Sequence, residues 1–415
     1  MSRTVHVIGA GLAGLAAAVR LRGEGAAVVV HEATGQIGGR CRSYYDRQTD
    51  LVIDNGNHLV LSGNTSAMAF LRAIGAEDRL VGPDEPEFEF ADFASGQRWT
   101  LRMNAGRIPW WILDPKRRVP GTRVSDYLKL ARLLHPPAQA TVGEVIDCSG
   151  NLHDRLVHPL LVAALNVMPH EGSAALAGAV IRETLAAGGS ACRPLVARTG
   201  LSHVFVDPAV EHLQARNVEI RLRHELRALR FDGGRVAELD FGEDTALLGP
   251  EDAVVLAAPA YAAANLVPEL STPTEYRPIV NAHFRIDPPA AFPPLIGVLN
   301  ATTEWLFAFP QRLSVTISNA DRLLEMPREQ LARDVWREVA AVAKIADELP
   351  PWQIVRERRA TFASTPAENA KRPAPSTRWR NLVLAGDWIA TGLPATIESA
   401  IRSGQRAADL IARGG

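Results

Sequence analysis

The sequence predicts an α/β protein in which a Rossmann-like, dinucleotide-binding domain is interleaved with a second, α+β domain. At the amino end of the chain, a glycine-rich turn lies between a short apolar strand and a strongly helical segment. At the carboxyl end, another buried strand is followed by a glycine-containing turn and a final helix. Segments of different character separate these two regions, so we expect the chain to cross between the domains several times.

Residues 5–32 have the clearest pattern. A β-branched run at 5–8 precedes the glycine turn, residues 15–22 favour a helix, and an apolar strand follows at 27–31. A strand, a helix and a second strand in so short a stretch indicate a βαβ unit with a parallel strand pair. This unit is expected to start the first sheet.

The middle of the chain changes type. Apolar residues at helical spacing predict helices within 125–134 and 150–168. Alternating residues predict an antiparallel meander of three strands at 218–222, 226–231 and 236–241, the last two joined by an Asp-Gly-Gly turn.

Later segments predict another sheet and two returns to the first one. Residues 252–258 predict a buried strand of the first sheet, and Pro259 is placed to open the following helix. The other expected elements are strands at 280–286, 305–309 and 313–317, an amphipathic helix at 328–345, a buried strand at 381–387 and a final helix at 395–412. The dinucleotide-binding parts are expected at 1–62, 193–272 and 375–415, and the second domain at 63–192, partly helical, and 273–374, a sheet with a helix.

Charge and cysteine content exclude several classes of protein. With 45 Lys+Arg against 46 Asp+Glu, the net charge is −1, which argues against nucleic acid as a partner. Cys41, Cys148 and Cys192 form no C-x-x-C pair, so neither a disulfide framework nor a metal site is expected. A signal-peptide pattern is absent at the amino end, and apolar stretches fall short of the roughly 18 residues of a spanning helix. We therefore expect a cytoplasmic protein.

Residues 9–14, Gly-Ala-Gly-Leu-Ala-Gly, match G-x-G-x-x-G in the context that this motif requires, after a strand and at the start of a helix. Such glycines allow a tight turn, approach of a pyrophosphate to the backbone, and close packing of helix on strand. Glu32 ends the second strand, where a carboxylate can accept hydrogen bonds from both ribose hydroxyls. An adenine dinucleotide is predicted. The alternative is a glycine turn with a chance acidic residue.

A second glycine pair with an arginine, Gly38-Gly39-Arg40, follows Glu32. Together with the first unit, residues 5–43 resemble the amino-terminal fingerprint of the flavin amine oxidase and phytoene desaturase superfamily. The resemblance implies FAD, held by a Rossmann-like domain of the glutathione-reductase type. Arg40 can pair with a phosphate; the alternative is a surface ion pair.

The carboxyl end carries the other half of the expected site. Gly386-Asp387 follows a buried strand, and Thr396 precedes the final helix. In the superfamily, the Gly-Asp pair contacts the ribityl and phosphate region, and the helix amino terminus faces the flavin pyrimidine. The alternative is a β-turn with an aspartate cap. The residues expected to bind the cofactor are Gly9, Ala10, Gly11, Leu12, Ala13, Gly14, Glu32, Ala33, Gly38, Gly39, Arg40, Asn55, Gly56, Asn57, Leu226, Gly386, Asp387, Thr396 and Ile397.

Three motifs, at 54–58 (Asp-Asn-Gly-Asn-His), 164–169 and 386–404, narrow the resemblance. They are similar to the squalene-associated, FAD-dependent branch of the superfamily, and the resemblance runs through essentially the whole chain. That branch, encoded in bacterial hopanoid pathways, removes the hydroxyl of hydroxysqualene reductively to give squalene. The resemblance therefore implies an oxidoreductase with an isoprenoid lipid substrate. Asn57 and Asn64 depart from the branch, where Gln and an aromatic residue are usual.

Removal of such a hydroxyl needs an acid that protonates the leaving oxygen and a dry, apolar pocket for hydride transfer from the flavin. The candidate catalytic residues are His58, Asp54 and Glu398. His58 could instead bond the cofactor or the loop, or be a satisfied core histidine. Asp54 could cap a turn, and Glu398 could cap its helix and balance Arg402.

A lipid substrate also has to leave a membrane. Residues 110–111 (Trp-Trp) and 116–118 (Lys-Arg-Arg) are candidates for an interfacial foot on the inner face of the membrane; the alternative is core tryptophans and a solvated basic turn. The apolar runs 160–165 and 176–181 either line a tunnel or pack in the core.

A second G-x-G-x-x-G after a strand is absent, so the reductant of FAD stays open between NAD(P)H and a redox protein.

Two rival functions stay open. A phytoene-type desaturase or an amine oxidase would keep the fold and reverse the electron flow, but only Trp388 stands near the final motif, where an amine cage needs an aromatic pair. A prenyl-lipid escort protein without redox function, like the GDP dissociation inhibitors, is the rival of another class. The intact turn at Gly9, together with Glu32 and Gly386-Asp387, argues against it.

Overall fold

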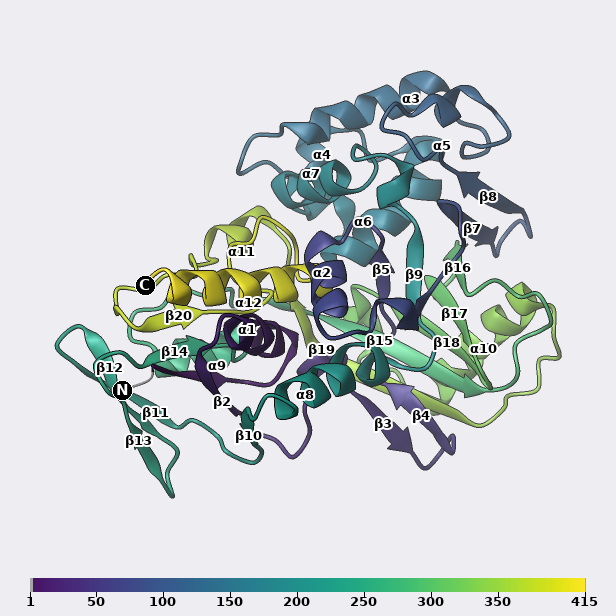
Figure 1. Cartoon of the computed structure of the whole chain (residues 1–415). Coiled ribbons are helices and arrows are strands. Elements are labelled where there is room, and N and C mark those ends of the chain that lie inside the picture. The colour runs from purple at the N-terminus through teal and green to yellow at the C-terminus, as the bar shows by residue number, and fades with distance from the viewer. Residues whose placement is uncertain (1–2, 415) are drawn as a thin grey trace.

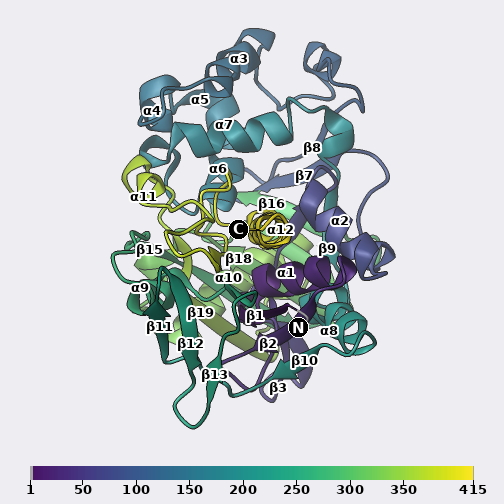
Figure 2. The same ribbon diagram turned by 60° about the vertical axis from the view of Figure 1, so that its left-hand side comes forward.

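The computed structural model describes residues 3–414. It contains a five-stranded parallel sheet, ordered β10-β2-β1-β14-β20, which collects strands from both ends and the middle of the chain. Its strands are β1 (Thr4–Ile8), β2 (Ala27–His31), β10 (Glu219–Arg221), β14 (Ala253–Leu256) and β20 (Leu382–Leu384). Helices α1 (Leu12–Gly23) and α12 (Ile397–Ala412) lie side by side against it (Figures 1 and 2).

The predicted βαβ unit is confirmed, as are the two returning strands, which pair in parallel through β14. One prediction is wrong. Residues 219–221 are not part of an antiparallel meander; they pair in parallel with β2 at the edge of the first sheet. Alternation alone cannot distinguish a half-covered edge strand of a parallel sheet from a meander strand, because both bury one face.

The second large sheet is mixed and has seven strands, in the order β19-β15-β18-β17-β16-β7-β8. Only the β7–β16 pair is parallel. Helix α10 (Arg328–Ala343) packs its apolar residues on one face. The strands are β7 (Glu87–Asp92), β8 (Arg98–Arg102), β15 (Tyr276–Arg285), β16 (Leu295–Leu299), β17 (Trp305–Phe309), β18 (Arg312–Ile317) and β19 (Trp352–Phe362). The predicted β15, β17, β18 and α10 are confirmed, whereas β7, β8, β16 and β19 were not predicted.

A helical lobe stands at the far end from the termini (Figures 1 and 2). The predicted helix within 150–168 is confirmed in part: it contains a π turn at His153–Val157 and ends at Leu165, because Asn166 adopts a left-handed conformation, φ 54. The predicted helix within 125–134 continues as a 3-10 turn. The helices of the lobe are α3 (Val124–Lys129), α4 (Val142–Val145), α5 (Gly150–Leu152), α6 (His158–Leu165) and α7 (Ala174–Glu183).

Smaller elements join these parts. The Asp-Gly-Gly turn connects two antiparallel strands as predicted, and β13 completes that sheet. The remaining strands and helices are β3 (Ser43–Asp46), β4 (Leu51–Asp54), β5 (Leu59–Leu61), β6 (Leu80–Val81), β9 (Pro194–Ala197), β11 (Ala228–Asp232), β12 (Arg235–Asp240), β13 (Thr245–Leu247), α2 (Thr65–Ala73), α8 (Asp207–Gln214), α9 (Ala260–Leu266) and α11 (Pro366–Ala370). Because β6 and β5 both pair with β9, the boundary predicted at residue 62 crosses a shared sheet. The domain boundaries stay predictions.

Within residues 3–414, every helix is too short or too polar to cross a membrane. In the same range, His, Cys, Asp and Glu side chains form no group of three or more that could hold a metal ion.

Candidate cofactor and active site

In the glycine turn after β1, two glycines allow close packing and the one between them leaves the backbone open to a ligand. A side chain on Gly9 (φ 105) would come within 2.7 Å of the Ala257 carbonyl oxygen, and one on Gly14 within 1.8 Å of the Gly9 carbonyl oxygen. A side chain on Gly11 would meet no atom within 4 Å. The first and third glycines therefore allow the turn and the helix to pack, while the backbone at Gly11 stays open at the amino terminus of α1. That opening suits a pyrophosphate.

Glu32 connects the turn to the loop that follows β2. Its Oε2 accepts a hydrogen bond from the Ala10 N–H at 2.9 Å, and its Oε1 accepts from the Thr34 N–H at 2.9 Å and hydroxyl at 2.8 Å. The side chain is buried at the carboxyl end of β2. The position of this carboxylate fits the ribose of an adenine dinucleotide, and the open turn fits its pyrophosphate.

The second glycine pair packs on the first turn. The Gly38 N–H donates to the Ala10 carbonyl at 2.9 Å, and Gly38 forms a parallel bridge with Gly11. A side chain on Gly39 would lie 3.4 Å from the Gly11 Cα. Both glycines have positive φ, 104 and 56, so the sequence uses glycine where the backbone is left-handed and crowded.

Arg40 joins the two ends of the chain. Its Nη2 lies 2.7 Å from Oδ1 of Asp387, and its Nη1 donates to the Ala360 carbonyl. The carboxylate of Asp387 raises the pKa of Arg40 further above its ordinary value. The Arg40 side chain is 45% exposed, which leaves it room for a second anion. The ion-pair alternative for Arg40 is thus realised, with another predicted cofactor residue as its partner; the contact with a phosphate stays a prediction.

Arg372, which the sequence analysis did not single out, hydrogen-bonds to the backbone of the loop after β20. The buried Arg372 donates to the carbonyls of Asp387 at 3.1 Å, Trp388 at 3.4 Å and Ile389. Burial lowers its pKa to about 10. Arg372 stands in a proline-rich connection without a motif, so the sequence carries no signal of this role.

The remaining predicted cofactor residues differ in burial. Thr396 caps α12, since its hydroxyl accepts from the Ser399 N–H at 3.1 Å, and Ile397 begins that helix. Leu226 is buried, whereas Ala33 is exposed beside Glu32.

The motif at 54–58 anchors the FAD-type domain on the seven-stranded sheet. The backbone N–H of Asn57 donates to Oδ1 of Asn281 at 3.2 Å, and its side chain donates to the Thr316 hydroxyl at 3.2 Å. The side-chain amide of Asn55 donates to the Glu357 carboxylate at 3.3 Å. A side chain on Gly56 would lie only 3.2 Å from the amide nitrogen of Asn281. Asn281 was not predicted, although a buried amide within the apolar strand β15 is a signal that could have identified it.

Asp54 is fully occupied by structural contacts. Its Oδ1 accepts from the Ser43 hydroxyl at 2.6 Å and the Leu201 N–H at 2.8 Å, and its Oδ2 lies 3.3 Å from Nη2 of the buried Arg312. These contacts favour the structural alternative for Asp54, and its catalytic role stays a prediction.

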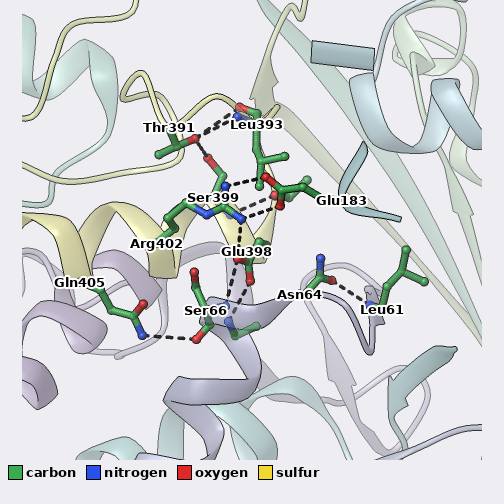
Figure 3. A network of polar contacts seen from close by, with 12 residues as sticks. Leu61, Asn64, Ser66, Glu183, Thr391, Leu393, Glu398, Ser399, Arg402 and Gln405 are labelled. Atoms are coloured by element: carbon green, nitrogen blue, oxygen red, sulfur yellow. Dashed lines mark hydrogen bonds and ion pairs between the residues drawn. The ribbon is translucent and has the colours of Figure 1, made fainter. Parts of the chain in front are cut away.

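Glu398 is occupied in the same way (Figure 3). Its carboxylate accepts from the backbone N–H groups of Ser66 at 3.0 Å and Ala67 at 2.8 Å, and Arg402 lies 2.9 Å away. Arg402 also pairs with Glu183 at 2.6 Å. The predicted pairing with Arg402 is thus present, but Glu398 caps α2 rather than its own helix. This geometry favours the structural alternative for Glu398, and its catalytic role stays a prediction.

His58 differs from both carboxylates. Its ring makes no hydrogen bond to another residue within 3–414, and the side chain is only partly buried. Burial lowers its pKa to about 4, against an opposing effect of Asp54, so the ring is neutral near pH 7. Of the three candidates, His58 is the one whose side chain makes no hydrogen bond to the residues that the structure describes.

The fold and this site define an FAD-dependent oxidoreductase. The chain belongs to the flavin-containing amine oxidoreductase family, whose model matches residues 12–412. Within that family it is 61% identical to a hydroxysqualene dehydroxylase of Rhodopseudomonas palustris, over 100% of both chains. It is 46% identical to a hydroxysqualene dehydroxylase of Zymomonas mobilis, over 98% of both.

Solved structures support the fold. A putrescine oxidase bound to putrescine superposes with a TM-score of 0.71 at 18% identity, over 100% of both chains. An oxidoreductase from Methanosarcina mazei gives a TM-score of 0.73 at 15% identity, over 98% of this chain and 100% of that one. The α/β FAD-binding fold expected from the sequence is confirmed, and FAD is the cofactor.

Proposed function

We propose that this chain removes the hydroxyl of hydroxysqualene reductively, with FAD as cofactor, to give squalene. The observation that carries the proposal is the 61% identity, over the full length of both chains, to a hydroxysqualene dehydroxylase. The site supports it, because the residues of the glycine turn, Glu32, Arg40 and Asp387 converge on one place suited to a dinucleotide.

The chain offers each part of FAD a partner of suitable chemistry. Glu32 would hold the ribose, the open backbone at Gly11 the pyrophosphate, and Arg40 with Asp387 the phosphate and ribityl region. The amino terminus of α12, capped by Thr396, would face the flavin. When bound in its reduced form, FAD supplies the hydride.

We propose His58 as the residue that hydrogen-bonds the leaving oxygen or the cofactor. Because its ring is neutral, it can donate one N–H without placing a fixed charge in the pocket. Asp54 and Glu398 instead stabilise the segments around the site through their hydrogen bonds. The reaction needs a dry pocket, and a large buried apolar cluster joins Leu161 and Leu176 of the helical lobe to Phe307 of the seven-stranded sheet.

The rivals receive less support. The indole of Trp388 is buried, and its N–H donates to the Ala258 carbonyl at 3.0 Å, so this ring serves the packing of the loop rather than an amine cage. The escort reading would have to explain why the turn around Gly11, Glu32 and Arg40 keeps the geometry of a dinucleotide site.

We also propose that the substrate is taken from a membrane surface, and that the flavin is reduced either by NAD(P)H that binds transiently or by a redox protein. Anaerobic mixing of the oxidised holoenzyme with NADH or NADPH distinguishes the two donors. Bleaching of the flavin absorbance on the timescale of turnover favours the nicotinamide, and no bleaching favours a redox protein.

The direct test is anaerobic incubation of photoreduced holoenzyme with hydroxysqualene. Flavin reoxidation and squalene formation are expected together, in equal amounts, because one hydride leaves each flavin for each squalene formed. A flavin that stays reduced, with no squalene, would refute the proposal. Bound prenyl lipid in a preparation without flavin absorbance would favour the escort protein.

A further inference from the structure

The tip of the helical lobe exposes large apolar side chains. Ile108 is 78% exposed, Trp110 50%, Leu113 65% and Leu128 65%. They stand within a single stretch of the chain, in the loop before the 3-10 turn Trp110–Leu113, in that turn, and in helix α3. Exposed apolar side chains gathered in this way indicate contact with a protein or a membrane.

This stretch is a packed part of the lobe rather than a loose loop. The neighbouring Trp111 is buried and meets Tyr127 edge to face, with ring centroids 5.3 Å apart, and the Tyr127 hydroxyl accepts from the Val119 N–H at 2.9 Å. Arg117 lies over the Trp110 ring at 4.7 Å and donates to the Arg102 carbonyl of β8 at 3.1 Å. The fold therefore buries Trp111 and Ile112 and exposes Trp110, so the core alternative holds for Trp111 and only Trp110 of the two tryptophans is left for an interfacial foot.

The same stretch is strongly basic. Residues 105–132 contain seven Lys and Arg and two Asp, in a chain whose net charge is −1. The basic residues that carry exposed charge make no side-chain ion pair or hydrogen bond to any residue the structure describes; they are Arg107, Lys116, Arg123, Lys129 and Arg132. Unpaired cations around apolar side chains complement anionic lipid headgroups over an acyl layer.

The buried side of the tip is continuous with a large apolar cluster. Trp111 and Ile112 belong to the same buried cluster as Leu161 of α6 and Trp305 of the seven-stranded sheet. In both overall views the lobe points away from the termini and from strands β11–β13 (Figures 1 and 2). A protein resting on this tip would keep the cofactor domain in water and turn its apolar interior towards the lipid.

We propose that residues 105–132 dock on an anionic membrane surface, with Ile108, Trp110, Leu113 and Leu128 inserted among the headgroups and the exposed basic residues on the lipid charges. The inference rests on the proposed function, which gives the protein a lipid substrate. A second copy of the chain is the other occupant that could cover these side chains, and this tip offers it like charge, which opposes self-association.

The test is flotation of the purified holoenzyme with vesicles of phosphatidylcholine alone and with about a third phosphatidylglycerol. We expect binding to the anionic vesicles only, weakened by salt. The apolar variant Ile108→Ser/Leu113→Ser/Leu128→Ser and the charge variant Lys116→Gln/Arg123→Gln/Lys129→Gln/Arg132→Gln should each lower the partition coefficient at least tenfold, since each lipid-bound cation contributes roughly fivefold.

The matched control is Val52→Ser/Leu222→Ser/Leu247→Ser, which removes three exposed apolar side chains elsewhere; Leu247 is 79% exposed on β13. It should bind as the parent does. Equal binding by the apolar variant and the parent, or equal loss in the control, would overturn the proposal. So would a parent that is dimeric by sedimentation and becomes monomeric in the apolar variant.

Squalene formation from detergent-dispersed hydroxysqualene should be unchanged in both tip variants. This readout separates the two proposals. Failure of the parent to form squalene refutes the function and leaves the vesicle result standing, whereas normal turnover without vesicle binding refutes only the docking surface.

Discussion

Arg40 and Asp387 are 347 residues apart in the chain and 2.7 Å apart in the structure. The first follows the βαβ unit that opens the fold, and the second follows β20, one of the last strands. We therefore predict that both ends of the chain are needed to hold the phosphate and ribityl region of FAD. The pair also joins the loop after β20 to the segment that contains the second glycine pair.

Replacement of Asp387 by Asn should weaken FAD binding about tenfold, because Arg40 loses its charged partner beside the cofactor. The flavin-to-protein absorbance ratio after dialysis measures the loss. Asp409→Asn is the matched control, since Asp409 pairs with Arg20 on the surface at 2.9 Å and such pairs contribute little. Equal retention of FAD by the two variants would contradict the role of the Arg40–Asp387 pair.

Replacement of Gly404 by Ala should destabilise the fold by about 1–3 kcal/mol, because the new methyl group would lie 2.0 Å from the Ala13 carbonyl and force α12 away from α1. Denaturant unfolding followed by far-UV circular dichroism checks this. Gly23→Ala, at the end of α1, meets no atom within 4 Å and should leave the stability unchanged or slightly raised. If the two variants unfold alike, the close helix contact does not limit stability.

Replacement of Glu398 by Gln should lower the free energy of unfolding by about 1–3 kcal/mol and leave the shape of the pH–rate profile unchanged. The cap on α2 and the bond to Arg402 weaken, but Arg402 keeps Glu183. The His58→Asn variant, measured in parallel, should lower the rate without such a loss of stability. A Glu398→Gln enzyme of full stability and rate reduced a hundredfold would instead make Glu398 the proton donor.

Acid should destabilise the fold through His31. Burial, with further contributions from His6 and His224, lowers its pKa from 6.5 to about 3. Between these values the unfolded chain binds a proton that the folded chain does not, so this contribution to stability is complete above about pH 6.5 and falls as the pH drops towards 3.

Replacement of His31 by Asn should therefore flatten the dependence of unfolding free energy on pH, by up to about 1.4 kcal/mol per pH unit. Urea unfolding between pH 4 and 7 measures the slope. His135→Asn, at an exposed position, is the control and should keep the slope of the parent. An unchanged slope in His31→Asn would show that His31 is not titrated on unfolding.

The elements and site residues that were predicted correctly can be recognised from their own stretch of the sequence. Gly9, Gly38 and Gly39 have positive φ, and Gly14 packs against the Gly9 carbonyl, so these positions need glycine and could be assigned from the sequence. Glu32 could be assigned because it comes directly after the strand that follows α1. Helix α10 was predicted because burial on one face leaves a period in the sequence, and strands β15, β17 and β18 were predicted because they are largely buried and form short apolar runs.

The parts that were missed depend on contacts between distant segments. Asp54 and Glu398 look like candidate acids in a motif, but their partners Arg312 and Ser66 lie hundreds of residues away. The same is true of β10, whose place beside β2 follows from the packing of the whole sheet rather than from its own three residues. Arg372 had no signal, since its partners are backbone carbonyls.

The side-by-side packing of α1 and α12 has a consequence for biosynthesis. Helix α1 is apolar on nearly every side and leaves the ribosome among the first segments, while α12, which covers it, leaves last. During translation the apolar surface of α1 therefore stays uncovered until the α12 segment has been made. A chain interrupted before α12 would leave the apolar surface of α1 uncovered, so we expect such a fragment to aggregate.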